Sequence, residues 1–357
     1  MGGSLRTYAC INARLRARIS KMLPEEFMQQ LERTRSLPEC IQQLRDTAYG
    51  AVEPAYRGTG DVRMAELAFY GEEIRMYLDL ESMAGGTLRR FIEALVARFE
   101  IDTLKNALRL WFDARVRKHA VSGAAGYLYR ERIHYDLNLD AIVNAEDLTA
   151  VAQVLEKTPY GQIVEALTEE VEERQSLFPL EVALDRFYYE RLVASINRLG
   201  LRDRRVARRI IGVEIDWVNV MWIMRVKRFY ADQPEDFTAD IVPGGAYLTE
   251  PRLRGVETAE EAEALLFDVV RHHYRRLSEQ LESGPVAAGL YPRLARLEDL
   301  LAEIHRTEAR RALCGYPFTV GIILAYFVLK EAEIQRLVAL LNAKAYGEPQ
   351  PEMEAIA

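Results

Sequence analysis

The sequence has few cysteines and no long apolar run. Its three cysteines, Cys10, Cys40 and Cys314, lack the even number of a disulfide framework and the paired spacing of a zinc site. The longest apolar run, Tyr316 to Leu329, has 14 residues, whereas a membrane-spanning helix needs about 20. We therefore expect no disulfide framework and no membrane-spanning helix, and we expect the apolar run to form a helix that is buried on most sides.

Lysine is also scarce, because 40 of the 47 basic residues are arginine and 7 are lysine. Either a GC-rich genome or the use of arginine at interfaces explains this bias. The formal net charge of −7 argues against non-specific binding of nucleic acid by the protein as a whole. Charges run throughout residues 1–23, so this segment lacks the apolar core of a secretion signal. A reducing cytoplasm fits these features.

Motifs for catalysis and for cofactor binding are missing. There is no Walker A loop, and residues 57–61 (RGTGD) lack its lysine. No two histidines have the i, i+4 spacing of a metal site, and no Asp-Asp pair is present to hold magnesium. No GxSxG sequence or cysteine-nucleophile signature occurs. We expect no catalytic residue, metal, cofactor or small-molecule substrate.

Helical periodicity dominates what is present. Ile11, Leu15, Ile19 and Leu23 recur every four residues and form one apolar stripe. No convincing alternating strand pattern occurs, so the predicted class is all-α. The further predicted helices cover residues 24–37, 63–83, 88–117, 148–156, 161–175, 180–199, 205–230, 259–282, 290–309 and 318–345.

An internal repeat divides the chain into related helical parts. The sequence from Leu44 to Gly50 reappears 111 residues later, and the Glu-Ile-Asp at residues 100–102 reappears 114 residues later. A fainter third copy covers residues 317–336. The predicted division is three repeats and a tail, at residues 1–115, 116–235, 236–346 and 347–357.

The repeated polar residues are interpreted first as scaffold. Threonine, tyrosine and glycine at a helix junction suit a cap, a hydrogen-bonded ring and a left-handed C-cap. A buried asparagine has to be hydrogen-bonded, so its predicted role is to tie adjacent helices, with a binding role as the alternative. The repeated residues are Thr47, Tyr49, Gly50, Asp102 and Asn106, with their copies Thr158, Tyr160, Gly161, Asp216 and Asn219.

A group of arginines is the candidate partner interface. Arg204, Arg205, Arg208 and Arg209 share one broad face of a predicted helix, and Arg90 corresponds to Arg204 in the repeat register. One interpretation is a solvated face with local acidic partners. The other is an anchor for acidic partner surfaces or lipid headgroups.

Four segments carry a further signal: residues 8–17 (YACINARLRA), 99–109 (FEIDTLKNALR), 241–245 (IVPGG) and 317–334 (PFTVGIILAYFVLKEAEI). Together they resemble the C-subunit family of V/A-type rotary ATPases, whose eukaryotic relatives are called d. The order of these segments and the threefold repeat make the resemblance specific over nearly the full chain.

The resemblance implies a fold and a role. Three similar helical units would form a funnel with approximate threefold symmetry. Its wide mouth would receive the central shaft, made of the D and F subunits, and its other face would rest on the membrane proteolipid ring. ATP would bind elsewhere, on the A and B subunits. The chain would then be a non-catalytic rotor subunit in the cytoplasm, peripheral to the membrane, that serves ATP synthesis or proton or sodium transport.

Two other classes of protein remain as alternatives. An unrelated helical adaptor would bind soluble partners and would not co-purify with a membrane complex. A helical enzyme would have a closed polar pocket with convergent titratable groups, for which the sequence offers no motif.

Overall fold

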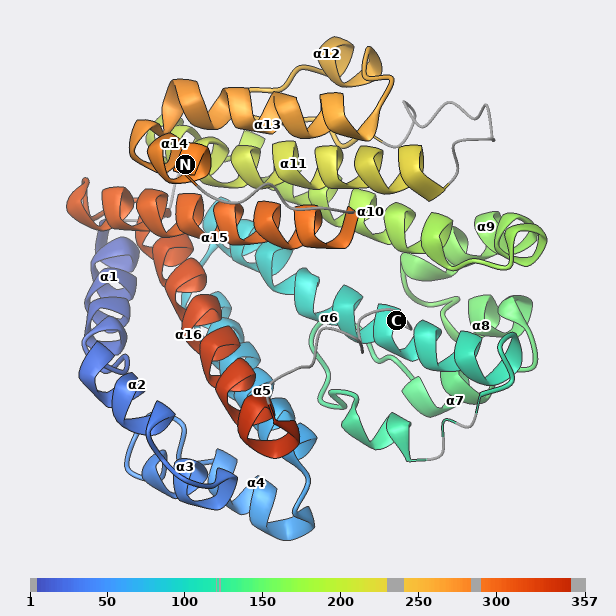
Figure 1. Ribbon diagram of the computed structural model, residues 1–357, viewed down its shortest axis with the longest axis horizontal. Helices are drawn as coiled ribbons and strands as arrows, with labels where there is room; N and C mark the ends of the chain where they lie inside the picture. Colours follow the sequence, from blue (N-terminus) through green and yellow to red (C-terminus); the bar gives the residue numbers. More distant parts are fainter. Residues whose placement is uncertain (1–4, 120, 122, 230–240, 284–289, 348–357) are drawn as a thin grey trace. The chain divides into compact units, whose positions relative to one another are not determined.

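The structure of the protein is a computed structural model that describes residues 5–119, 121, 123–229, 241–283 and 290–347. Within these residues the chain forms helices and no β-strand, which confirms the all-α prediction there (Figure 1). The elements are α1 (Leu5–Ile19), α2 (Glu25–Glu32), α3 (Leu37–Gln43), α4 (Val52–Thr59), α5 (Val62–Met83), α6 (Gly86–Arg115), the 3-10 helix η1 (Ala124–Tyr127), α7 (Leu139–Asn144), α8 (Leu148–Val154), α9 (Tyr160–Arg174), α10 (Phe178–Asn197), α11 (Leu201–Phe229), α12 (Glu250–Arg254), α13 (Ala259–His273), α14 (Arg275–Ser283), α15 (Leu290–Cys314) and α16 (Gly321–Tyr346).

Short polar side chains mark the starts of several helices. The first turn of a helix leaves backbone N–H groups without intrahelical partners, and a capping side chain accepts from one of them. Asp147 accepts from the N–H of Ala150 at 2.7 Å before α8, and Thr258 accepts from the N–H of Glu261 at 3.1 Å before α13. These caps set where the amphipathic helices begin.

The structure divides one predicted helix, residues 259–282, into α13 and α14. The break is at Tyr274, whose φ of −132° and ψ of 55° lie outside the helical region. The short helices α3, α4, α7 and α12 lie largely outside the predicted ranges. They have five to eight residues, too few to establish a helical period in the sequence.

The chain forms two compact units, each built from separate stretches of sequence. Unit I comprises Met1–Asn12, Gly85–Ala94 and Val182–Val328, and unit II comprises Ala13–Ala84, Leu95–Glu181 and Leu329–Ala357. Their boundaries differ from those of the three predicted repeats, which stay a prediction. Of the predicted tail, residues 348–357 lie outside the described residues.

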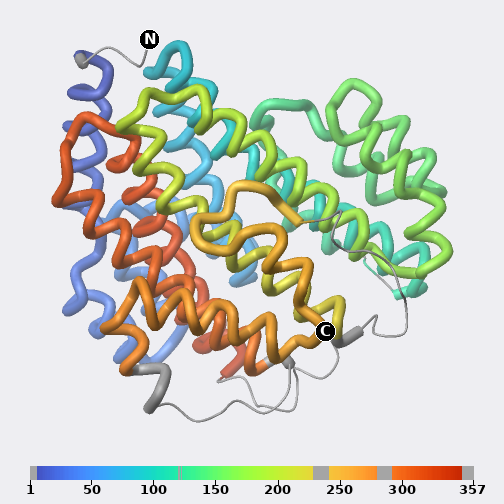
Figure 2. Tube along the Cα trace, turned by 90° about the horizontal axis from the view of Figure 1, so that it is seen from above, coloured from blue at the N-terminus to red at the C-terminus, as the bar shows by residue number. Residues whose placement is uncertain are grey.

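The core of unit I forms around α11, which packs against α13 and α15. Both views show α13 beside α11 (Figures 1 and 2). Trp217, Leu266 and Leu297 are fully buried in this core, and the indole N–H of Trp217 donates to the carbonyl of Leu297 at 2.9 Å. Burying these large apolar side chains holds α11 in place.

In unit II, α4 packs against α5 and α8 packs against α9. One core cluster combines α2 to α5 with side chains from the second half of α16, including Leu337 and Leu341. The ring of Tyr49 lies in this core and meets Phe69 edge-on, with the ring centroids 5.1 Å apart. The repeated junction at Tyr49 is therefore part of a packed core.

The longest apolar run forms the start of α16. Every residue from Gly321 to Val328 is buried, which confirms the prediction of a helix buried on most sides. Tyr316, ahead of the helix, is 52% exposed. No helix in the described part of the chain has both the length and the apolarity needed to cross a membrane.

Candidate functional site

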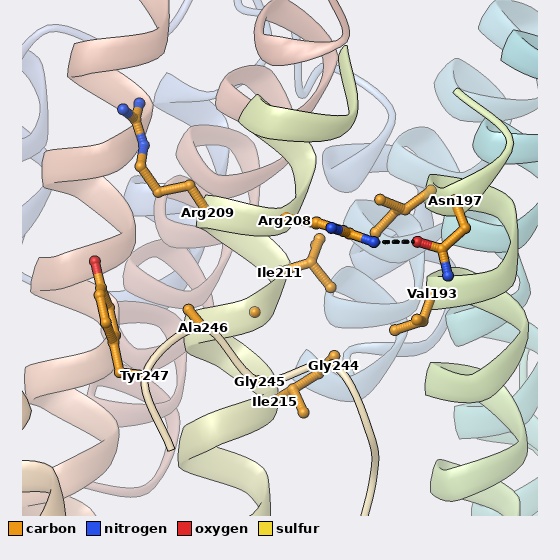
Figure 3. Close-up of a pocket in the computed structure, with 12 residues that line it drawn as sticks. Val193, Asn197, Arg208, Arg209, Ile211, Ile215, Gly244, Gly245, Ala246 and Tyr247 are labelled. Carbon is orange, nitrogen blue, oxygen red and sulfur yellow. Dashed lines mark hydrogen bonds between the residues drawn. The ribbon is translucent and has the colours of Figure 1, made fainter. Parts of the chain in front are cut away.

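A cavity of about 590 Å³ lies in unit I beside α11 (Figure 3). Its walls are the end of α10, the first half of α11 and the loop that precedes α12. The lining residues are Val193, Ile196, Asn197, Arg208, Arg209, Ile211, Gly212, Ile215, Gly244, Gly245, Ala246 and Tyr247. The cavity thus brings two of the predicted arginines next to the predicted Pro-Gly-Gly loop.

Two repeated residues on α11 hold this loop in place. Asp216 is fully buried, and its carboxylate accepts from the backbone N–H groups of Ala246, Tyr247 and Leu248 at 3.1, 2.8 and 3.1 Å. Asn219 donates to the carbonyl of Val242 and accepts from its N–H, both at 2.9 Å. The predicted buried asparagine is therefore found at Asn219, where it ties a helix to a loop.

Glycines let the loop approach α11 closely. A Cβ on Gly245 would lie 2.1 Å from Oδ1 of Asp216, and a Cβ on Gly212 would lie 3.0 Å from the Cβ of Ala246. Gly244 has a φ of +107°, a conformation that side chains disfavour. Gly245 is thus required by the contact between the loop and Asp216, and Gly244 by its positive φ.

The burial of Asp216 has an electrostatic cost. Burial raises the pKa of Asp216 from its ordinary value of 3.8 to about 6, while the three backbone N–H donors lower it. The donors stabilise the charged carboxylate and so offset part of the cost of removing it from water. The loop and the carboxylate therefore stabilise each other.

The same residues in the first repeat are arranged differently. Asp102 is partly exposed, and Nε of Arg98 on the same helix lies 3.8 Å from its Oδ2. Asn106 is exposed and accepts from Arg109 at 3.2 Å. The prediction of a buried amide that ties helices therefore does not hold for Asn106.

In the structure, the arginines of the predicted face have different partners. Arg208 donates to Oδ1 of Asn197 at 2.7 Å, whereas Nε of Arg209 lies 2.6 Å from Glu308 (Figure 3). Arg204 is half-buried and donates to the carbonyl of Leu199 at 3.0 Å. Arg209 therefore has a local acidic partner, and Arg204 serves the start of its own helix.

The remaining two arginines of the predicted interface are exposed. Arg205 lies on α11 and Arg90 on α6, both within unit I. Among the described residues, neither Arg205 nor Arg208 pairs with a carboxylate. Arg205 and Arg208 are thus two exposed positive charges of α11 without a carboxylate partner in the described part of the chain.

The two copies of the Thr-x-Tyr-Gly junction have matching backbone contacts. The Thr47 hydroxyl donates to the carbonyl of Leu44 at 2.7 Å and accepts from the N–H of Tyr49 at 3.1 Å. Thr158 makes the corresponding bonds to Leu155 and Tyr160 at 2.8 and 3.2 Å. Each threonine closes the turn that leads into the next helix.

The glycines of these junctions serve a different purpose from the one predicted. Neither Gly50 nor Gly161 has the positive φ of a left-handed C-cap. A Cβ on Gly50 would lie 2.6 Å from the carbonyl oxygen of Arg45, and one on Gly161 would lie 2.7 Å from that of Leu155. Both positions exclude a side chain because the backbone passes too close.

The chain matches known proteins over nearly its whole length. A match to the family described as "ATP synthase (C/AC39) subunit" covers residues 11–355. The chain belongs to the C/AC39 family of V/A-type ATP synthase subunits. This C/AC39 chain is 27% identical to the C subunit of the A-type ATP synthase of Haloferax volcanii, over 99% of this chain and 97% of that one. It is 26% identical to the corresponding protein of Halorubrum lacusprofundi, over 96% and 95%, and 25% identical to that of Methanosphaera stadtmanae, over 94% and 84%.

The hydrogen-bond partners of the two repeated tyrosines in this C/AC39 chain were not predicted from the sequence. The hydroxyl of Tyr160 donates to Oε1 of buried Glu100 at 2.7 Å, and the hydroxyl of Tyr49 donates to Glu333. Lys330 donates to the hydroxyl of Tyr49 at 2.7 Å. Both acids stand in a recurring Glu-Ile pair, at residues 100–101 and 333–334, and this recurrence is the sequence signal for them.

A metal site and a second hollow are the other features of this C/AC39 chain to consider as sites. The described residues contain no group of three or more His, Cys, Asp or Glu side chains placed to hold a metal ion. A second, small hollow in unit II lies next to Glu100 and residues 129–139. The oxygens of Glu100 are taken by Tyr160 and by the backbone N–H groups of His134 and Tyr135 at 2.8 Å each, so this acid is structural.

Proposed function

We propose that this chain is the non-catalytic central-stalk subunit of an A-type ATP synthase, where it couples the shaft, made of the D and F subunits, to the membrane proteolipid ring. The observation that carries the proposal is the family match over residues 11–355, together with the shared name of relatives that align almost end to end. In this role the chain transmits torque during ATP synthesis or ATP-driven transport of protons or sodium ions.

A torque-transmitting subunit has to be stiff and has to hold two partners under load. Long packed helices supply the stiffness, and the proposed fold for the assembled subunit is a funnel of three similar helical repeats. Superposing residues 1–115 on 116–235 in an experimental structure of the assembled complex tests the repeats. Tyr49 should fall on Tyr160, and Asn106 should fall within about one helical position of Asn219; unrelated folds would refute this arrangement.

The proposed partner interface contains Arg90 and the arginines of α11. Arg90, Arg205 and Arg208 are exposed, which is what an electrostatic contact with an acidic surface requires. Exposed pairs contribute about 0–1 kcal/mol each, so such a contact sets orientation and association rate more than affinity. The proposed location of the subunit is the cytoplasmic face of the membrane, within the complex.

The proposed division of labour leaves nucleotide binding to other subunits. The chain has no Walker A loop to cradle phosphate, so the purified subunit should bind no ATP in isothermal titration calorimetry. Stoichiometric, tight ATP binding by the isolated chain would refute the non-catalytic role.

The experiment that tests the proposal is affinity purification from solubilised membranes. An affinity-tagged chain, expressed in its own host, should bring down the shaft subunits and the ring protein, as identified by mass spectrometry. The alternative, a helical adaptor for soluble partners, predicts that no membrane protein co-purifies. That result would refute the proposed function.

A further inference from the structure

Two exposed arginines stand at the cavity beside α11 without an acidic partner. Arg208 lines the cavity, and Arg205 lies one helical turn away on the same side of α11. A guanidinium group has five N–H donors, and Arg208 uses one of them on Asn197. No carboxylate is among the residues that line the cavity. This part of an otherwise acidic chain is therefore positively charged and has donors to spare.

Much of the remaining cavity wall is apolar. The side chains of Val193, Ile196, Ile211 and Ile215 line it, and Figure 3 shows Val193, Ile211 and Ile215 on the side of the cavity toward the loop. On α11, Leu201 is 79% exposed and precedes Arg205 by four residues, so it continues the same helical stripe outside the cavity. Aliphatic and cationic groups thus lie side by side on this surface. Such a surface is complementary to a segment with both aliphatic and acidic side chains.

The cavity wall is rigid. Asp216 and Asn219 fix the loop backbone through five hydrogen bonds, and Asn197 holds the guanidinium of Arg208. Binding to a surface that is already ordered loses less conformational entropy. A site that stays open and ordered is suited to a partner that docks without rearrangement.

We propose that Arg205, Arg208 and the cavity form a docking site for an acidic segment of another protein subunit, with an aliphatic side chain inserted below Arg208. The proposal rests on the proposed function, because the partner is another subunit of the ATP synthase. Charge complementarity selects the acidic partner. A membrane surface fits less well, because the apolar cavity beside Arg208 has room for a side chain, which the headgroups of a membrane surface do not supply.

The test compares two variants of equal charge change in the full-length chain. Arg205→Glu/Arg208→Glu reverses the site, and Arg252→Glu/Arg276→Glu reverses two exposed arginines of unit I that do not line the cavity. The probe is the purified ATP synthase depleted of this chain, and the readout is its dissociation constant at 50 and 300 mM salt. Circular dichroism checks that each variant has the helical content of the wild type.

We expect the site variant to bind roughly tenfold or more weakly than the control variant at 50 mM salt, with a smaller difference at 300 mM. Equal affinities for the two variants at 50 mM salt would overturn the docking site while the proposed function stands. If the wild-type chain does not bind the depleted complex at all, the proposed function fails, and the docking site fails with it.

A second pair of variants tests the cavity itself. Asn197→Trp places a large ring at the rim, while Asn197→Ala removes the same hydrogen bond and leaves the cavity open. The tryptophan variant should weaken binding equally at both salt concentrations, and the alanine variant, which only loses the hydrogen bond to Arg208, should weaken it much less. Equal binding by both would overturn the insertion of a side chain. Binding to vesicles of phosphatidylcholine, with and without phosphatidylglycerol, tests a lipid surface as the partner. The proposal would also be overturned if the site variant lost binding only to the anionic vesicles.

Discussion

Buried carboxyl groups organise much of this structure at the scale of single residues. Asp216 accepts three backbone N–H groups, and Glu100 accepts two backbone N–H groups and a tyrosine hydroxyl. Glu73 on α5 differs, because it is 3% exposed and its Oε1 has no hydrogen-bond partner among the described residues. A buried carboxyl without partners favours its protonated form.

The titration of Glu73 should make stability fall as the pH rises. Burial, and after it the charge of Glu331, raise the pKa of Glu73 from 4.5 to about 8, while Arg98 and Lys330 lower it. The folded protein therefore keeps a proton between about pH 4.5 and 8 that the unfolded chain releases. The free energy of unfolding should drop across this window, by at most roughly 1.4 kcal/mol per pH unit from this group.

Glu73→Gln should remove that dependence, because the amide cannot ionise. The measurement is urea unfolding followed by circular dichroism at pH 6 and pH 8.5. Glu72→Gln, at a partly exposed neighbouring position, serves as the control and should keep the dependence of the wild type. An unchanged pH dependence in Glu73→Gln would show that Glu73 is ionised in the folded protein at pH 6.

Gly245 should tolerate no side chain. A Cβ there would lie 2.1 Å from Asp216, so Gly245→Ala should push the loop away from α11 and cost roughly 2 kcal/mol or more of stability. The control is Gly58→Ala in α4, where nothing lies within 4 Å and alanine should stabilise by roughly 0.5–1 kcal/mol. Thermal unfolding gives the midpoint temperature of both variants. Equal midpoint temperatures for Gly245→Ala and Gly58→Ala would contradict the close contact of loop and helix.

At the scale of elements, the two tyrosine junctions connect their helices to distant acids. Tyr160→Phe would leave Oε1 of buried Glu100 without its donor, and should cost about 1–3 kcal/mol. Tyr49→Phe should cost more, because Lys330 and Glu333 both lose a partner in a buried place. Tyr56→Phe is the control, since its half-buried ring makes no hydrogen bond among the described residues. Urea unfolding measures the free energy of unfolding of the three variants. A Tyr49→Phe variant as stable as Tyr56→Phe would contradict the role of the junction.

The long helices were predictable from the sequence because their apolar period extends over many turns. Predicted residues 63–83 and 88–117 correspond to α5 and α6 within two residues at each end. The break at Tyr274 was not predictable, because the apolar residues continue through it. The two Glu-Ile-Asp sequences have different surroundings, because Asp216 accepts from a loop whereas Asp102 lies near Arg98 on its own helix. A local motif does not show such tertiary contacts.

For the candidate site, the sequence located the arginines but not their partners. Helical spacing placed Arg208 and Arg209 on one broad face, yet Asn197 on α10 and Glu308 on α15 draw them to different neighbours. Those neighbours are 11 and 99 positions away in the sequence, so no local pattern reports them. The cavity follows from how α10, α11 and the loop pack, and only the structure provides that.

For the whole molecule, the proposed function requires that one chain bridges a rotating shaft and a membrane ring. The direct measurement is a two-sided binding experiment with purified parts. The D–F shaft is immobilised, the chain is added, and the detergent-solubilised proteolipid ring is passed over it. We expect the ring to be retained only when the chain is present, in one complex that contains all the parts. Retention of the ring without the chain, or failure of the chain to bind either part, would contradict it.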